Sequence, residues 1–299
     1  SFMVLDQTTR RNLELFRTMA DGSRRGSLIG LLDRAATAMG SRRLRQWIGA
    51  PLLDPGLIET RLRAVELLHG SAELREALRD RLAMVHDIER LNGKVMSGRA
   101  TPRDLKALSD SLQQVPAIDM LLDRSDAREL PVFALLPDLE DLRADIAAVL
   151  TEEPPHSISD GGIVRRGYHP ELDELIDLSR EGKGALVRLE SEERSRTGIS
   201  SLKVRYNRVF GYFIEVTKAN LAAVPAHYVR KQTLANSERY LTDELKQFEA
   251  KVLGAEERRC SLEMELFQQL RSRVAERAQS LAALAERLSS IDAVYSLAE

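Results

Sequence analysis

Apolar residues recur at three- and four-residue spacing along most of the chain, the pattern of helices that bury one face. Residues that suit helix ends divide the pattern: Asp54 with Pro55 and Thr101 with Pro102 suit starts, and Gly70 suits an end. The sequence therefore predicts one helix that begins at Ser27 and further helices from Ser41 to Pro51, from Pro55 to Gly70, from Ala72 to about Val95, from Thr101 to Leu112, from Ala117 to Leu122 and from Leu139 to Leu150. Asp6 and Asp138 are further candidate caps. Because each has one apolar face, we expect a bundle.

Two of these helices have a marked apolar stripe, which we expect to be buried. The stripes consist of Leu28, Leu31, Leu32 and Ala35 in one helix, and of Leu57, Ile58, Leu62, Val65 and Leu68 in the other.

Two long helices are expected in the second half of the chain. Residues 151–170 are rich in glycine and proline and predict a loop, after which Pro170 opens a helix. Gly182 and Gly184 weaken that helix by about 1 kcal/mol each relative to alanine, so we expect motion at 180–190. The helical pattern returns at Thr242 and continues without proline to about residue 286, which predicts a helix roughly 65 Å long at about 1.5 Å per residue.

Between the two long helices the apolar period changes to two residues. The alternation covers Leu202 to Tyr206 and Val209 to Lys218, where β-branched and aromatic residues concentrate, and two shorter runs cover Tyr228–Thr233 and Glu238–Leu241. Asn207 and Arg208 could form a hairpin turn. The predicted fold is therefore mainly α, a helical core with two long antiparallel helices that carry a small four-stranded antiparallel β module.

Charge is distributed unevenly along the chain. The 299 residues carry a net charge of −2, but the segment 194–240 carries +7 and the remainder −9. The basic residues of the segment are Arg194, Arg196, Lys203, Arg205, Arg208, Lys218, Arg230, Lys231 and Arg239, against Glu215 and Glu238. A polyanion is the expected partner.

Catalytic signatures are missing from the sequence. Lys94 and Lys183 follow glycines but lack the rest of a phosphate-binding loop, the five histidines are scattered, and no Gly-x-Ser-x-Gly turn occurs. We therefore expect no enzyme activity, no metal and no cofactor in this chain. The lone Cys260 favours a reducing compartment, and neither a signal peptide nor a membrane-spanning run is expected.

The basic segment has two interpretations besides nucleic-acid binding. Charges on an open sheet face can serve solubility alone, although that role normally mixes both signs. The long helices could instead form a coiled-coil interaction arm whose basic tip docks an acidic protein. Arg42, Arg43 and Arg45 near Trp47 could also touch nucleic acid, but Trp47 fits an apolar stripe, which favours core packing with a solvated arginine face.

Several segments resemble the MutS family of DNA mismatch-recognition proteins. They are TRRNLEL (9–15), GSLIGLLDRAATAMGSRRLRQWIGAPLLD (26–54), DIERL (87–91), GYHPELDEL (167–175), KVRYNRVFGYFIEVTK (203–218) and YVRKQTLANSERYLTDELKQFEAKV (228–252). The resemblance covers nearly the whole chain. It implies a core or lever domain in residues 1–190 and 242–299 and a clamp domain in 191–241.

The resemblance also implies a role for the chain. The clamp would contact duplex DNA without sequence specificity through Arg205, Asn207, Arg208, Lys218, Arg230, Lys231, Gln232, Thr233 and Asn236. Ala235 stands where members of the family often have lysine. The family's mismatch-reading domain, connector and ATPase domain, with its ATP and Mg²⁺, are missing from these residues, so we expect the excised middle of a larger cytoplasmic, nucleoid-associated bacterial protein.

The larger protein is expected to form a homodimer and to engage a MutL-type partner, and the chain by itself is expected to be monomeric. A free-standing hydrolase is the least favoured hypothesis.

Overall fold

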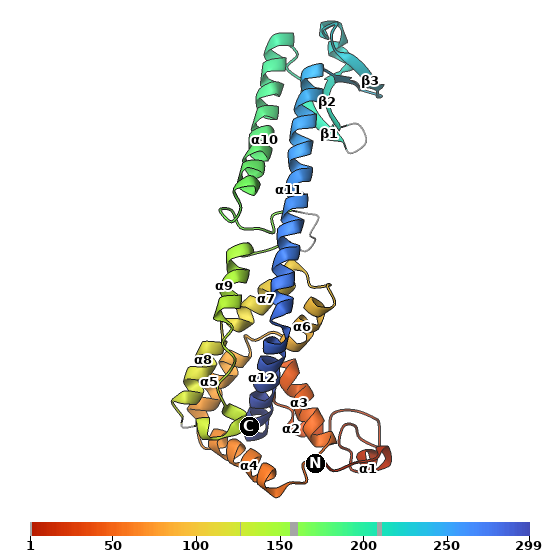
Figure 1. The fold of residues 1–299 in the computed structure, drawn as a ribbon. Coiled ribbons are helices and arrows are strands. Elements are labelled where there is room, and N and C mark those ends of the chain that lie inside the picture. The colour runs from red at the N-terminus through yellow and green to blue at the C-terminus, as the bar shows by residue number, and fades with distance from the viewer. Residues whose placement is uncertain (1, 126, 156–160, 208–210) are drawn as a thin grey trace. The chain divides into compact units, whose positions relative to one another are not determined.

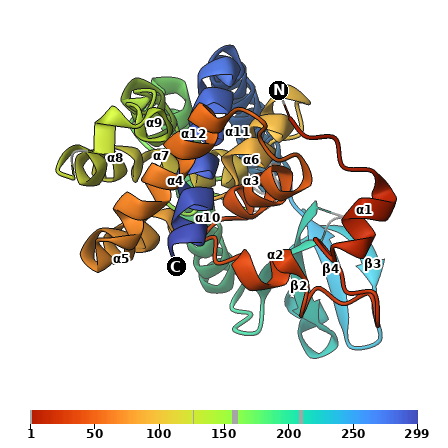
Figure 2. The same ribbon diagram turned by 90° about the horizontal axis from the view of Figure 1, so that it is seen from below.

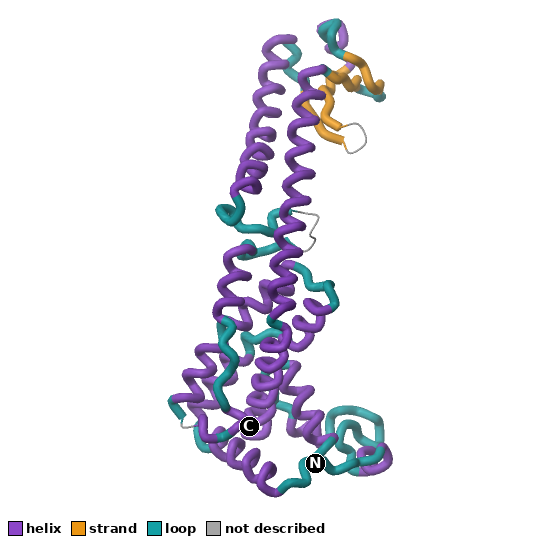
Figure 3. Tube along the Cα trace, viewed as in Figure 1, coloured by secondary structure: helices purple, strands orange, loops and turns teal. Residues whose placement is uncertain are grey.

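The structure is a computed structural model that describes residues 2–125, 127–155, 161–207 and 211–299, without the side chains of 180–183. The chain forms two compact units, one of Ser1–Ile158 with Phe267–Glu299 and one of Ser159–Leu266. Helices dominate both, and the strands of one small sheet lie between Lys203 and Leu241 (Figures 1 and 3). The predicted fold class, mainly α with a four-stranded antiparallel module, is confirmed.

The first unit is built from helices joined by short connections. Its elements are α1 (Gln7–Asn12), α2 (Leu28–Leu32), α3 (Ala38–Gly49), α4 (Pro55–His69), α5 (Ala72–Leu82), α6 (Ile88–Met96), α7 (Pro102–Leu112), α8 (Val115–Asp123), η1 (Ala127–Glu129), η2 (Pro131–Phe133), α9 (Glu140–Val149) and α12 (Ala278–Ala298). Asp6, Asp54 and Thr101 cap α1, α4 and α7 through their side chains, as predicted. Asp138 accepts a hydrogen bond from the Glu140 amide at the start of α9 (3.0 Å).

Helix α12 is the central element of the first unit. It packs against α3, α4 and α6, which surround it in Figure 2. Its apolar side chains are buried along most of its length, including Leu281, Leu284, Leu288, Ile291 and Val294. The core of this unit therefore forms around its last helix.

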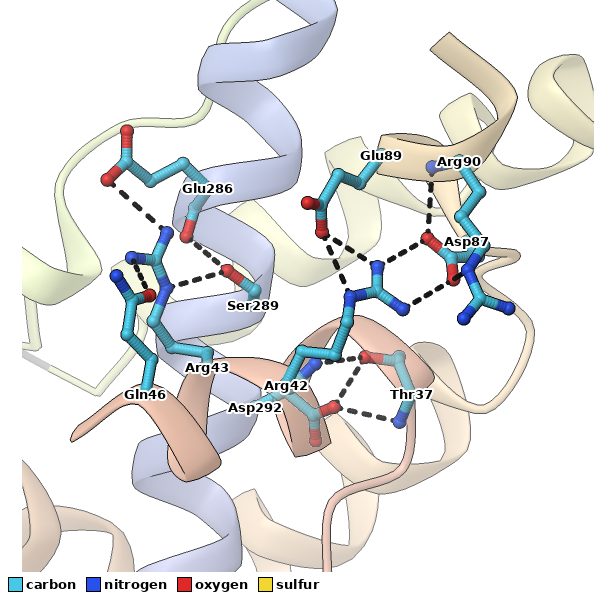
Figure 4. A network of polar contacts seen from close by, with 11 residues as sticks. Thr37, Arg42, Arg43, Gln46, Asp87, Glu89, Arg90, Glu286, Ser289 and Asp292 are labelled. Carbon is cyan, nitrogen blue, oxygen red and sulfur yellow. Dashed lines mark hydrogen bonds and ion pairs between the residues drawn. The ribbon is translucent and has the colours of Figure 1, made fainter. Parts of the chain in front are cut away.

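Polar contacts fix α3 in this unit (Figure 4). The carboxylate of Asp292 on α12 accepts hydrogen bonds from the amides of Ala36 and Thr37, both at 2.8 Å, and from the Thr37 hydroxyl at 2.6 Å. Thr37 is the N-cap of α3. On the same helix Arg42 pairs with Asp87 (2.8 Å) and Glu89 (2.7 Å) at the start of α6. One end of each of these contacts is a helix start, Thr37 for α3 and Asp87 for α6, so side chains of neighbouring helices fix where α3 and α6 begin.

The second unit consists of α10 (Pro170–Thr197), β1 (Lys203–Asn207), β2 (Gly211–Thr217), η4 (Lys218–Ala223), β3 (Val229–Thr233), β4 (Ser237–Leu241) and the first part of α11 (Asp243–Glu276). Its antiparallel sheet has the order β1-β2-β4-β3, so β1 and β3 are the edges. The two long helices run antiparallel, because Glu171 near the start of α10 pairs with Arg258 of α11 (2.9 Å) whereas Leu189 and Leu245 share one core cluster.

The single helix predicted from Ala72 to about Val95 is wrong, because α5 ends at Leu82 and α6 begins at Ile88. The Asp87 side chain caps α6 by accepting from the Arg90 amide (3.1 Å). The His86 amide donates to the Ser111 hydroxyl (2.9 Å) instead of to a helical carbonyl. A contact with α7 thus takes the backbone out of the helix.

The single helix predicted from 242 to about 286 is also interrupted. Helix α11 ends at Glu276, α12 begins at Ala278, and Arg277 between them has φ −95° and ψ 9°. The Arg277 side chain pairs with Asp141 (2.7 Å), and the neighbouring Arg273 pairs with Asp145 (2.8 Å). These ion pairs with α9 hold the chain at the break.

Both predicted apolar stripes are only partly buried. Of the first stripe, Leu32 and Ala35 are half-buried. In α2, Ile29 is buried while Leu28 and Leu31 are exposed. That helix has only five residues, because the following amides leave it to reach α12, the Arg34 amide donating to the Ser296 hydroxyl (2.7 Å). In α4, of the predicted stripe only Leu68 is buried; Leu57, Ile58 and Leu62 are exposed and Val65 is half-buried.

Two further predictions fall partly on residues that the structure does not describe. Asn207 is the last residue of β1, and Arg208, its predicted partner in a turn, lies outside the described residues. Gly182 and Gly184 both lie within α10. The predicted motion at 180–190 stays a prediction.

Candidate nucleic-acid interface

The two faces of the sheet differ in what covers them. Directly paired residues of an antiparallel sheet lie on the same face, and neighbours along a strand alternate. Ile214 and Val216 of β2 are fully buried and join a cluster with Leu189 of α10 and Leu245 of α11. This face, the inner face, packs on the helices. The outer face carries Lys203 and Arg205 of β1, Phe213 and Glu215 of β2, Gln232 of β3 and Arg239 of β4.

Lys203 and Arg205 leave an open positive edge on the outer face. Both side chains are exposed, and the register pairs Arg205 with Phe213 and Lys203 with Glu215. Among the described residues neither side chain has an ion pair or hydrogen bond. Lys203 was not among the predicted contact residues, although the two-residue alternation from Lys203 to Arg205 already puts both on one face.

Arg239, in contrast, is used within the sheet. Its guanidinium carbon lies 4.3 Å from the centre of the Phe213 ring, and Nη1 donates to Gln232 Oε1 at 2.8 Å. Its Nε lies 3.6 Å from a carboxylate oxygen of Glu215. The guanidinium stacks on the Phe213 ring, which is buried and also belongs to the apolar cluster of this unit.

Arg194 and Arg196 are neutralised by acidic residues of α10. Arg194 pairs with Glu190 (2.7 Å) and donates from Nε to the Leu202 carbonyl (2.7 Å), and Arg196 pairs with Glu193 (2.5 Å). These acids precede the 194–240 segment, so its charge of +7 overstates the free positive charge.

Glu193 also contacts the sheet. It is buried and accepts a hydrogen bond from the Tyr228 hydroxyl. Burial, together with this bond to a carboxylate, raises the pKa of Tyr228 above its ordinary value. Tyr228 therefore stays protonated and serves as a buried link between α10 and the strands.

The edge strand β3 carries two basic residues in different situations. Arg230 is exposed and lies 3.5 Å from Glu238, which also accepts from the Tyr240 hydroxyl (2.6 Å). Burial and this bond raise the pKa of Tyr240 to about 12. Lys231 occupies the bulge between Arg230 and Gln232, is exposed, and has no ion pair among the described residues. A bulged residue is left out of the strand ladder, so Lys231 is free to contact a partner.

Three of the predicted contact residues gather at one end of the sheet. The Lys218 amide donates to the Asn236 carbonyl (3.1 Å), which joins the start of η4 to the β3–β4 turn, where Thr233 is also found. The side chains of Lys218, Thr233 and Asn236 are exposed. Asn207 is half-buried at the opposite end, about 20 Å away by the length of β2. Arg208 lies outside the described residues.

Of the basic residues of the sheet and its connections, four therefore have exposed side chains without a carboxylate partner among the described residues. We call Lys203, Arg205, Lys218 and Lys231 the open basic surface. Arg230 and Gln232 already have partners in the sheet. No group of three or more His, Cys, Asp and Glu residues in the described part of the chain is placed to hold a metal ion. The sheet thus offers cations and hydrogen-bond donors.

The fold and this surface define a mainly helical protein that carries a small, basic, antiparallel sheet between two long helices. The sequence profile of the family described as MutS domain III matches residues 8–298. The chain belongs to this family, as the motifs indicated.

Similar proteins match this chain over almost its whole length. It is 46% identical over 298 residues to the DNA mismatch repair protein MutS of Alkaliphilus metalliredigens (strain QYMF), which covers 99% of this chain and 34% of that protein. It is 49% identical over 300 residues to the DNA mismatch repair protein MutS of Pelotomaculum thermopropionicum, which covers 100% and 35%. The corresponding protein of Myxococcus xanthus is 46% identical over 301 residues. The chain spans about a third of the length of the curated relatives it matches.

Among the described residues, none of the helices is both long enough and apolar enough to cross a membrane.

Proposed function

We propose that the open basic surface binds the phosphate backbone of duplex DNA without sequence specificity. The observation that carries the proposal is the contrast within the sheet: Arg194, Arg196 and Arg239 are neutralised internally, whereas Lys203, Arg205, Lys218 and Lys231 are not. Solubility alone would not require this separation. Lysine and arginine contacts to phosphates give affinity but carry no base information, which suits a protein that must hold any sequence.

The remaining predicted residues take secondary parts in this proposal. Thr233 and Asn236 are exposed beside Lys218 and can donate to phosphate oxygens as neutral groups. Arg230 and Gln232 must first loosen their contacts with Glu238 and Arg239. Asn207, the last residue of β1, and Arg208, which follows it in the sequence, would add further contacts to the duplex.

In the longer protein, the sheet would act as a clamp (residues 191–241) carried by a core or lever domain (1–190 and 242–299). The helices α10 and α11 would couple the position of the clamp to an ATPase domain that binds ATP and Mg²⁺, while this chain itself would have no enzyme activity. A homodimer would supply a second clamp, and a MutL-type protein would respond to the clamped state. This part of the proposal rests on family membership and on the long helices.

A salt titration tests the DNA contact. Binding of the chain to a labelled random-sequence duplex should weaken steeply with salt, by a slope of about −0.9 in log K against log salt for each phosphate neutralised. The double variant Arg205→Glu, Lys231→Glu should make the slope shallower by about 1.8, because two contacts are lost. Affinity at 50 mM salt should fall at least tenfold.

The chain offers a matched control in the same unit. Arg188 of α10 and Lys251 of α11 are exposed and lie outside the sheet, so Arg188→Glu with Lys251→Glu changes the net charge equally. The control should bind within about twofold of the unmodified chain. Equal losses in both variants would mean that only net charge matters and would refute a specific surface. Binding to an acidic protein, but not to duplex at 50 mM salt, would favour the interaction-arm alternative.

A further inference from the structure

A second cluster of arginines lies in the first unit, in an open pocket of about 930 Å³ between α1, the loop that follows it, and α3. None of the described residues that line the pocket is acidic. The arginines are Arg10 and Arg11 of α1, Arg17 of the loop, and Arg42 and Arg45 of α3. This pocket uses none of the residues of the open basic surface.

The structure holds most of these arginines without neutralising them. Arg10 donates to the Gly49 carbonyl (3.0 Å), and Arg17 donates to the Gly22 carbonyl (3.1 Å). The guanidinium of Arg45 lies over the Phe16 ring at 4.2 Å. Within the described part of the chain, Arg11 makes no ion pair or side-chain hydrogen bond.

Only Arg42 has carboxylate partners, Asp87 and Glu89. Four guanidiniums therefore share the pocket without an ion pair among the described residues. The carboxylates of Glu14 and Asp21, in the same loop, instead accept hydrogen bonds from the Met19 amide and the Thr18 hydroxyl.

Helix ends account for part of this charge but not for most of it. Arg10 and Arg11 lie in the last turn of α1, and Gly49 is the last residue of α3, so each helix offers roughly half a negative charge. Two such helix ends together supply a charge of about −1, whereas the four guanidiniums carry four positive charges. Arginines that serve solubility are usually interspersed with acids, which this pocket lacks. The excess positive charge points to an anionic ligand.

We propose that this pocket binds phosphate groups of a nucleic-acid backbone. A guanidinium is planar and presents five donors, so one that is fixed by a carbonyl or a ring still has N–H groups for phosphate oxygens. Gln7 and Gln46 add neutral donors, and the Phe16 ring holds Arg45 in one orientation. The pocket is open, as a polymer that passes over it requires, whereas sites for small ligands enclose most of the ligand surface.

Paired variants of the full chain test this site. Arg11→Gln with Arg45→Gln removes two charges from the pocket, and the control Arg63→Gln with Arg79→Gln removes two exposed charges from α4 and α5 of the same unit. We expect the pocket variant to bind random duplex at least tenfold more weakly at 100 mM salt, with a slope shallower by about 1.8. The control should stay within about twofold, and the circular dichroism of both should match that of the unmodified chain.

Hydrogen exchange locates the contact and separates this proposal from the one for the sheet. Duplex should slow exchange at residues 7–19 and 42–50, and should still do so in the Arg205→Glu, Lys231→Glu variant. Such protection together with unchanged binding by the sheet variant would leave the pocket standing while the proposed sheet contact failed. A pocket variant that binds like its control would overturn the inference. Protection of these segments by pyrophosphate but not by duplex would also overturn it, because the site would then take only small anions.

Discussion

Replacing Asp292 should destabilise the first unit more than replacing any exposed acid of the same helix. Asp292 has no exposed surface, and its carboxylate accepts three hydrogen bonds from Ala36 and Thr37 (Figure 4). Burial raises the pKa of Asp292, since no cation among the described residues pairs with it. The group therefore exchanges hydration for hydrogen bonds at the start of α3.

The magnitude follows from the donors that are left behind. Asp292→Ala strands the buried Thr37 amide and removes the acceptor of its hydroxyl, at about 1–3 kcal/mol for each unsatisfied donor. Ala36 is half-buried and can recruit water, and removal of a buried charge returns part of the cost. We expect a net loss of about 3 kcal/mol in the free energy of unfolding. Asp292→Asn keeps one acceptor oxygen and should lose about half as much.

The control is Glu286→Ala on the same helix. Glu286 pairs with Arg43 at 3.3 Å, but its side chain is 69% exposed, so its loss should cost less than about 1 kcal/mol. Unfolding in urea, followed by the fluorescence of the chain's only tryptophan, measures the right transition because Trp47 lies on α3. A local probe is needed since the two units need not unfold together. Equal stability of the Asp292→Ala and Glu286→Ala variants would refute the reasoning.

Three further outcomes are expected. Gly40→Ala should lower the free energy of unfolding by about 1–3 kcal/mol in a urea titration, although alanine has the better helix propensity. The reason is that a Cβ at Gly40 would lie 2.6 Å from the Asp292 Cβ and force α3 away from α12. A more stable variant would contradict this close approach. Burial alone would raise the pKa of Asp104, but bonds from Lys94 and Thr101 outweigh it and hold that pKa below 3.8. The ionised carboxylate therefore contributes its full stability at pH values above the pKa of Asp104 in the unfolded chain, and this contribution is lost as pH falls through the lower pKa of the folded state. The cost of Asp104→Asn should be about 1–2 kcal/mol at neutral pH and should shrink below about pH 4. A cost that grows towards low pH would contradict this reasoning. Duplexes with and without a single mismatch should bind the chain within about twofold of each other in an anisotropy titration, and a clear mismatch preference would show that these residues read bases.

Local signals in the sequence predicted the elements whose boundaries depend on neighbouring residues. The caps at Asp54 and Thr101 and the strands from Lys203 to Leu241 belong to this class. The break between α5 and α6 could not be found in the same way, because Leu82, Val85 and Ile88 continue the helical spacing across it. A hydroxyl of α7, 25 residues further along the chain, takes the amide that the helix would have used.

The candidate surface was predicted in outline but not in detail. Counting charges from Arg194 onward missed Glu190 and Glu193, which precede the counted segment and neutralise its first two arginines. The stacking of Arg239 on Phe213 depends on a strand order in which β4 lies beside β2, and no local pattern gives that order. Lys203, in contrast, could have been included from alternation alone.

The contact between Thr37 and Asp292 also bears on the order in which the chain folds. The two residues are 255 positions apart, and the whole of Ser159–Leu266 lies between the two pieces of the first unit. The second unit is continuous in sequence, so it can form as soon as Leu266 has been made, whereas α3 has to wait for α12. Contacts of such long range also slow folding, because a large loop must close before they form. During synthesis, therefore, the second unit can be complete while the first unit still lacks its last helix.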